Sequence, residues 1–140
     1  MQITRNGAET ARGSTDWFTG VVHLDSLAAP AGASQISAAS VHFTPGARTA
    51  WHRHPRGQTL WITEGLGLCQ PEGGPIEVMR PGDRVVFEAG ENHWHGAAPH
   101  RFMTHIAMQQ ADDNGNVVEW GRHVSDDEYA QAPSLELSRS

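Results

Sequence analysis

Turn-forming residues recur at short intervals along this sequence, and this pattern limits the possible folds more than any other feature. The turn signals are Pro45-Gly46, Pro55-Arg56-Gly57, Glu64-Gly65, Gly73-Gly74-Pro75, Pro81-Gly82-Asp83, Ala89-Gly90-Glu91-Asn92 and Asn114-Gly115. Between them lie short apolar runs at Ala38–Phe43, Gln58–Thr63, Gly67–Gln70, Ile76–Met79, Arg84–Phe87, Phe102–Gln109 and Asn116–Trp120. Short strands separated by such turns are typical of all-β sandwiches and barrels. The sequence therefore predicts an all-β fold.

The two ends of the chain carry local signals of their own. An aromatic and β-branched run predicts an early strand over residues 16–24. Asn114-Gly115 is typical of a two-residue hairpin turn. Ser125, followed three residues later by Glu128, forms a capping box, which predicts a short helix through about Gln131. The polar tail over residues 132–140 is expected to be flexible.

Length and composition indicate one small domain. The chain has 140 residues, of which 38% are hydrophobic, enough for one modest core. We therefore expect a single domain over residues 1–140, with its core at about 36–110 and a C-terminal segment at 116–131.

Charge and hydropathy exclude several classes of partner. The net charge is −6 and no Lys/Arg cluster could neutralise a run of phosphates, so a nucleic-acid partner is not expected. No stretch approaches ~18 apolar residues, and the first residues do not resemble a signal peptide, so no membrane association is expected. The only cysteine, Cys69, cannot form an intrachain disulfide, which fits a cytoplasmic protein.

Histidine is unusually frequent: there are nine, against 10 Lys and Arg together. Since residues i and i+2 of a strand point to one face, His52 and His54 should present both imidazoles to the same side. Gln58 opens the next predicted strand, so the three side chains would form a metal clamp on a β-hairpin. His93 and His95 repeat the spacing, and one histidine from this second pair would complete a set of four ligands.

These residues resemble the two motifs of the cupin family. Gly46-x5-His52-x-His54-x3-Gln58-x6-Gly65 matches the spacing of the first motif, with Gln58 in place of the usual Glu. Gly82-x5-Glu88-x-Gly90-x2-His93-x3-Ala97 matches the second, departing from the usual Pro at Glu88 and the usual Asn at Ala97. The resemblance implies a single-domain cupin, a double-stranded β-helix or jelly-roll barrel. It says less about the reaction, because one fold hosts many chemistries.

A closer similarity narrows the expected activity. Five segments resemble the bacterial cupin hydroxynitrile lyases: Asp16–Gly20, Pro45–His52, Gly57–Leu60, His93–Ala97 and Met103–His105. This resemblance implies an R-selective enzyme that splits or forms cyanohydrins such as mandelonitrile and forms homodimers or homotetramers. It also implies one divalent metal per chain, Mn²⁺ first and Fe²⁺ or Zn²⁺ otherwise. The implied ligands are His52, His54, Gln58 and His93, with His95 and His105 close behind them.

The residue types suit this chemistry. An amide at Gln58 instead of a carboxylate leaves the metal close to its full charge, which favours Lewis-acid chemistry on an anionic guest. A neutral histidine suits the proton transfer between the cyanohydrin hydroxyl and cyanide. His105 is the first candidate for this base and His95 the second. The side chains expected to shape the substrate pocket are Ala39, Val41, Phe43, Leu60 and Gln109.

Two alternatives share the same ligands. One is a metal-dependent cupin dioxygenase or other oxidoreductase of a small molecule, although the usual set of two histidines and one carboxylate is absent from the motif. The other is a cupin that binds a metal or small molecule without turnover. Activity without O₂ separates the lyase from the oxygenase.

Overall fold

The computed structural model describes residues 1–7 and 9–133. Its strands are β1 (Ala11–Arg12), β2 (Phe18–Thr19), β3 (Val22–Ala28), β4 (Ile36–Phe43), β5 (Arg48–Thr49), β6 (His52–Arg53), β7 (Gln58–Gly65), β8 (Gly67–Pro71), β9 (Glu77–Met79), β10 (Arg84–Phe87), β11 (His93–Ala97), β12 (Met103–Gln110) and β13 (Glu119–Trp120). One short helix, α1 (Asp126–Tyr129), follows. The all-β prediction is confirmed. The tail expected to be flexible lies, from residue 134 on, outside the described residues.

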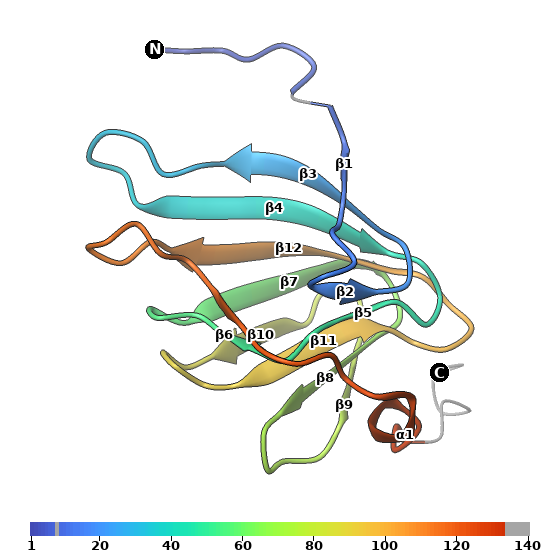
Figure 1. Ribbon diagram of the computed structural model, residues 1–140. Helices are drawn as coiled ribbons and strands as arrows, with labels where there is room; N and C mark the ends of the chain where they lie inside the picture. The colour runs from blue at the N-terminus through green and yellow to red at the C-terminus, as the bar shows by residue number, and fades with distance from the viewer. Residues whose placement is uncertain (8, 134–140) are drawn as a thin grey trace.

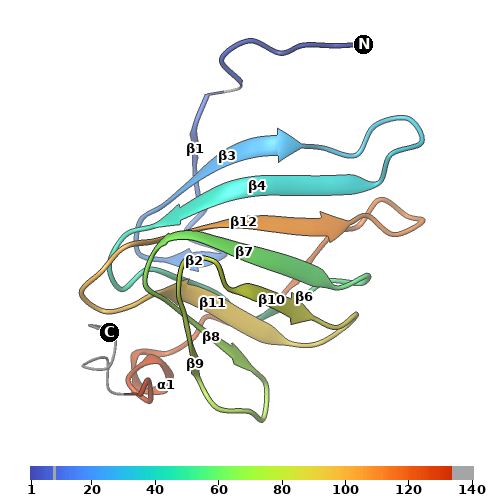
Figure 2. The same ribbon diagram turned by 180° about the vertical axis from the view of Figure 1, so that it is seen from behind.

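The strands form two antiparallel sheets that face each other (Figures 1 and 2). The first has the order β1-β3-β4-β12-β7-β10. The second has the order β13-β6-β11-β5-β2, with β8 pairing both β11 and β9. Consecutive strands such as β6 and β7 lie in different sheets, so the chain repeatedly crosses between the two layers. This arrangement closes a barrel whose interior receives alternate side chains from both sheets.

Two apolar clusters hold the layers together. The barrel interior is packed with Val22, Val41, Phe43, Leu60, Ile62 and Met103, among others. A second cluster, on the outer side of the second sheet, contains Trp51, Leu68, Ile76, Trp94, Val124 and Tyr129. Figure 1 shows α1 against this side of the second sheet. Trp51 and Trp94 therefore pack outside the barrel, as their alternation with histidines predicts.

The predicted early strand is divided in two. β2 belongs to the second sheet and β3 to the first. Gly20 lies between them with φ +83°, and a Cβ at this position would lie 2.9 Å from the Cα of Ala47. Only glycine combines this conformation with so close a backbone contact. The single strand predicted over residues 16–24 is therefore wrong, because the chain changes sheet at Gly20.

Two hairpin predictions also fail. A turn is present at the predicted position, since the N–H of Gly115 donates to the carbonyl of Asp112. The flanking strands do not pair with each other, however: β12 pairs with β4 and β7, whereas β13 pairs with β6. The predicted hairpin that would carry His52 and Gln58 is likewise absent, because β6 and β7 lie in opposite sheets.

The C-terminal helix begins as predicted. The N–H of Glu128 donates to the Ser125 hydroxyl, and the Glu128 carboxylate accepts from the N–H of Ser125. The helix ends at Tyr129, two residues before the predicted end. Among the described residues, no helix has both the length and the apolar character needed to cross a membrane.

Candidate metal centre

Two histidines on and just after β6 point into the barrel. His52 and His54 are buried, whereas Arg53 between them is exposed. The Nδ1 of His52 donates to the carbonyl of Ala50 at 2.9 Å, and the Nδ1 of His54 donates to the carbonyl of Val117 at 2.7 Å. Because a backbone carbonyl only accepts, each proton resides on Nδ1 and each Nε2 carries a free lone pair.

His93 supplies a third lone pair from the neighbouring strand. β11 pairs with β6 so that His93 lies directly opposite His52, and the two ring centroids are 4.3 Å apart. Its Nδ1 donates to the carbonyl of Glu91 at 2.8 Å, which leaves its Nε2 without a proton as well. The ring of Phe87 stacks on this imidazole with centroids 3.6 Å apart. Register and packing thus fix the orientation of the ring.

Gln58 faces this group from the opposite sheet. Its Nε2 donates to the Oε1 of Gln109 at 3.0 Å, and the Nε2 of Gln109 donates to the hydroxyl of Ser37 at 3.0 Å. This relay turns the Oε1 of Gln58 towards His93, where it lies 3.1 Å from Nε2. Both of these atoms are acceptors, so their contact in a buried site is unfavourable unless a cation lies beside them. The donor set therefore fits a bound metal ion.

His95 and His105 form a second histidine pair in the same interior. The Nε2 of His105 lies 3.0 Å from the Nδ1 of His95. The remaining nitrogens, His95 Nε2 and His105 Nδ1, are buried and have no hydrogen-bond partner within the described part of the chain. The same is true of His54 Nε2. Unpartnered buried nitrogens of this kind indicate a site built for a metal or a substrate.

The buried histidines that could together hold a metal ion are His52, His93 and His95, whose candidate ligand atoms lie within 4.8 Å of one another. The sequence-based ligand set contains two of them and adds His54 and Gln58. All five residues line or border one interior. The ring centroid of His95 lies 5.1 Å from that of His52 and 5.7 Å from that of His93. The structure thus groups His52, His93 and His95, and the ligand set that includes His54 and Gln58 stays a prediction.

Burial keeps these histidines neutral. It lowers the pKa of His52 and His95 well below the usual value, and neighbouring histidines add to the shift. It also lowers the pKa of His54, that of His93 to about 3 and that of His105 to about 4. Neutral imidazole is the form that ligates metals and accepts protons, so the group is ready for either task near pH 7.

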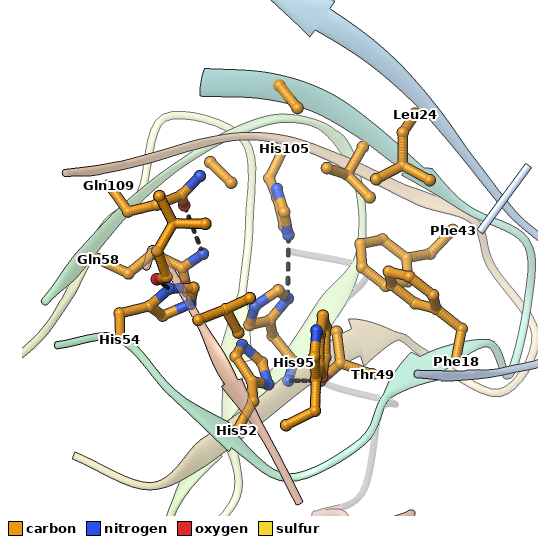
Figure 3. A pocket seen from close by; sticks show the side chains of 16 residues that line it. Phe18, Leu24, Phe43, Thr49, His52, His54, Gln58, His95, His105 and Gln109 are labelled. Atoms are coloured by element: carbon orange, nitrogen blue, oxygen red, sulfur yellow. Dashed lines mark hydrogen bonds between the residues drawn. The ribbon is translucent and has the colours of Figure 1, made fainter. Parts of the chain in front are cut away.

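A cavity of about 140 Å³ opens beside the histidines (Figure 3). Figure 3 shows Gln58, Gln109 and His54 on one side and Phe18, Phe43 and Leu24 on the other, with the remaining histidines between. Of the predicted pocket residues, Ala39, Val41, Phe43 and Gln109 line this cavity. Leu60, also predicted there, is instead fully buried in the barrel core and is not among the described residues that line the cavity.

Several residues that line the cavity were not predicted from the sequence: Phe18, Leu24, Thr49, Val117, Val118 and Trp120. Phe18 is buried, whereas Trp17 beside it is 38% exposed. Val117 and Trp120 belong to a segment that crosses from β12 to the second sheet. Their apolar character was the only local signal, because their position depends on this crossover.

Known proteins share this architecture. The Cupin domain family model matches residues 39–104. The chain is 51% identical over 130 residues to an (R)-mandelonitrile lyase from Granulicella tundricola, covering 92% of this chain and 98% of that protein. A cupin-like protein from Thermotoga maritima has a crystal structure that matches with a TM-score of 0.83 and 36% identity, over 96% of this chain and 98% of that one.

A more distant structure, that of a polyketide cyclase from Streptomyces resistomycificus, matches with a TM-score of 0.64. Its identity of 19%, over 95% of this chain and 94% of that one, supports the fold alone. Together these matches confirm the fold class predicted from the two motifs.

Proposed function

Since this chain belongs to the cupin family, we propose that it is a metal-dependent hydroxynitrile lyase that cleaves or forms cyanohydrins such as (R)-mandelonitrile. One observation of the site carries the proposal: two buried acceptors, Gln58 Oε1 and His93 Nε2, face each other at 3.1 Å. A neutral donor set of this kind suits a metal that keeps most of its charge. The 51% identity to an (R)-mandelonitrile lyase supports the reaction.

The proposed ligands are His52, His54, Gln58 and His93, and the proposed ion is Mn²⁺, with Fe²⁺ or Zn²⁺ as alternatives. When bound, the ion supplies a Lewis acid for the substrate oxygen or for cyanide. The protein contributes orientation: three backbone carbonyls fix the Nδ1–H tautomers, and the relay through Gln109 fixes the Gln58 amide.

His105 is the proposed general base, with His95 as the second candidate. In cleavage, the base removes the hydroxyl proton while the carbon–cyanide bond breaks, and the electron pair leaves with cyanide. The carbonyl group forms, and the proton then passes to cyanide to give HCN. Burial lowers the pKa of His105 to about 4, so this ring is neutral and able to accept a proton at neutral pH.

The size of the cavity supports an aromatic substrate. An engineered protein cavity of ~150 Å³ binds benzene, and the cavity beside the histidines measures about 140 Å³. Apolar and aromatic side chains form one side of it, Gln58, Gln109 and His54 form the other, and the proposed base His105 lies between them. A ring with a short polar arm, as in a cyanohydrin of benzaldehyde, matches this division.

An assay under strictly anaerobic conditions tests the proposal. Protein reconstituted with Mn²⁺, Fe²⁺ or Zn²⁺ in turn should release benzaldehyde and HCN from mandelonitrile, and chiral chromatography of the reverse reaction should show the R product. The same preparation without metal is the control. Turnover only with O₂ would instead support the dioxygenase alternative, and tight binding without product would support a non-catalytic binding protein.

We also propose that the chain forms homodimers or homotetramers in the cytoplasm. Large apolar side chains are exposed on the outer face of the first sheet, among them Ile36, Trp61, Val86 and Met108. Exposed apolar patches often mark protein contacts. Light scattering coupled to size-exclusion chromatography measures the oligomer directly, and a monomeric mass at micromolar concentration would contradict the proposal. The free, buried thiol of Cys69 is compatible with a reducing compartment.

A further inference from the structure

Trp120 forms part of the cavity wall next to the histidines. It lies on β13, directly opposite His52 in the pairing with β6, and the two ring centroids are 4.8 Å apart. The edge of Phe18 meets the Trp120 ring at a centroid distance of 5.8 Å, and Phe18 in turn meets Phe43 at 6.2 Å. Three aromatic rings therefore line the cavity together.

Trp17 supports the Trp120 ring from another side. The two rings stack with centroids 5.3 Å apart and planes inclined by 14°. Trp17 is 38% exposed and does not belong to the residues lining the cavity, within the described part of the chain. Its contact with the site is therefore indirect, through Trp120.

The backbone around Trp120 is anchored on both sides. The N–H of Gly121 donates to the carbonyl of Trp51 at 2.7 Å, and the N–H of Trp51 donates to the carbonyl of Arg122 at 2.9 Å. Three residues earlier, the carbonyl of Val117 accepts from His54. Because both flanks are held, the indole has a fixed place before any ligand arrives, which lowers the entropic cost of binding.

Two of the three rings in this wall come from outside the part of the sequence that carries the potential metal ligands. His52, His54, Gln58, His93 and the wall residue Phe43 lie within the matched family region 39–104. The wall residues Phe18 and Trp120, and Trp17 behind them, lie outside it. The flanking segments thus add an aromatic surface to the site that the family core provides. Differences in such segments can change which substrate is accepted without touching the ligands.

We propose that Trp120 is a specificity-determining residue, whose indole holds the aryl group of the substrate, and that Trp17 is the positioning residue behind it. This inference rests on the proposed lyase function. Aromatic rings attract each other beyond simple burial in stacked or edge-to-face geometry, and three aromatic rings line this cavity. An aliphatic cyanohydrin would lack these contacts and would depend much less on Trp120.

Trp120→Leu tests the proposal, with Trp120→Phe as the conservative variant and Phe102→Leu as the control. Phe102 is an exposed aromatic residue that is not among the described residues lining the cavity. The measured quantity is the ratio of kcat/KM for mandelonitrile to kcat/KM for 2-hydroxypropanenitrile. We expect Trp120→Leu to lower this ratio roughly tenfold, mainly through KM for mandelonitrile. Trp120→Phe should restore most of it, and Phe102→Leu should match the unchanged protein.

Trp17→Leu should shift the same ratio in the same direction but less. Metal content is measured in every variant, because Trp120 also contacts His52. Equal losses for both substrates, or an unchanged ratio in Trp120→Leu with full metal content, would overturn the assignment. A larger effect of Trp17→Leu than of Trp120→Leu would overturn the supporting role of Trp17.

Binding of benzyl alcohol separates this inference from the proposed reaction. Calorimetric titration of metal-loaded protein with this unreactive aryl probe needs no turnover. We expect Trp120→Leu to weaken binding roughly tenfold and Phe102→Leu to leave it unchanged. If the protein does not cleave cyanohydrins but shows this binding pattern, the lyase proposal is wrong and the role of Trp120 in binding an aryl group is supported. If cleavage is normal but Trp120→Leu does not change the affinity for benzyl alcohol, the lyase proposal is supported and the role of Trp120 is refuted.

Discussion

The Nε2 of His105 lies 3.0 Å from the Nδ1 of His95 in the buried centre of the barrel. Two neutral imidazoles at this distance share one proton, and its location decides what the outer nitrogens do. If His105 donates, its Nδ1 is a free base and His95 Nε2 carries a proton. If His95 donates, its Nε2 has a free lone pair and joins the donor set of His52 and His93. This pair therefore links the choice of base to the choice of ligands.

His105→Ala is expected to keep the metal and lose most of its turnover. Loss of a general base typically costs on the order of 100- to 10,000-fold in rate. The measurement is kcat for mandelonitrile cleavage together with metal content by elemental analysis. His23→Ala, which removes an exposed histidine, is the control. Full activity of metal-loaded His105→Ala would refute its role as the base and direct attention to His95.

Alanine variants of single histidines distinguish two possible ligand sets. One is the proposed set of His52, His54, Gln58 and His93, and the other is the group of His52, His93 and His95. Under the proposed set, His52→Ala and His54→Ala lose Mn²⁺ and activity together, whereas His95→Ala retains the metal. Equilibrium dialysis against Mn²⁺ measures the affinity of each variant. The opposite pattern, with metal retained in His54→Ala and lost in His95→Ala, would establish His52, His93 and His95 as the ligands.

Gln58→Glu is expected to bind the metal more tightly and turn over more slowly. A carboxylate adds a negative charge beside the ion and reduces its strength as a Lewis acid. It also removes the donor that now points at Gln109. We expect kcat to fall on the order of tenfold, which corresponds to about 1.4 kcal/mol in the activation barrier. Metal titration and steady-state kinetics on one preparation check both effects, and a faster enzyme would contradict the charge argument.

The metal-free protein should lose stability as pH falls below 6.5. The buried histidines have lower pKa values in the folded state than the unfolded value of about 6.5. Unfolding therefore takes up protons below that pH. Their contribution is fully present above pH 6.5 and decreases towards the folded values, about 4 for His105 and about 3 for His93.

Each such histidine adds a slope of about 1.4 kcal/mol per pH unit to the free energy of unfolding. Urea denaturation between pH 6.5 and 5 measures this slope. His105→Gln should reduce this slope by about 1.4 kcal/mol per pH unit. A flat profile in this range would show that the histidines are already protonated in the folded protein.

Features that depend on residues close together in the sequence were predicted correctly. The i, i+2 alternation of a strand places His52 with His54 and His93 with His95, and the Ser125 capping box starts α1. These follow from local backbone geometry. The spacing of the two motifs was specific enough to indicate the fold.

Sheet membership was predicted less well. A turn signal such as Asn114-Gly115 predicts a local reversal of the chain, but it does not predict which strand the next segment will pair with. In the structure this segment pairs with β6, and Trp120 contacts His52 there. Gly20 likewise separates β2 from β3 because of a close contact with Ala47, 27 positions further along the sequence.

The sequence by itself therefore determined most of the longer strands, the inward-facing histidines and the family, since periodicity and motif spacing are properties of neighbouring residues. Only the tertiary structure decided three further features: the shared proton of His95 and His105, the turning of Gln58 by Gln109, and the aromatic wall at Trp120. Each of them joins residues that are distant in sequence. Such contacts depend on which strands pair and at what register, and local patterns do not specify these.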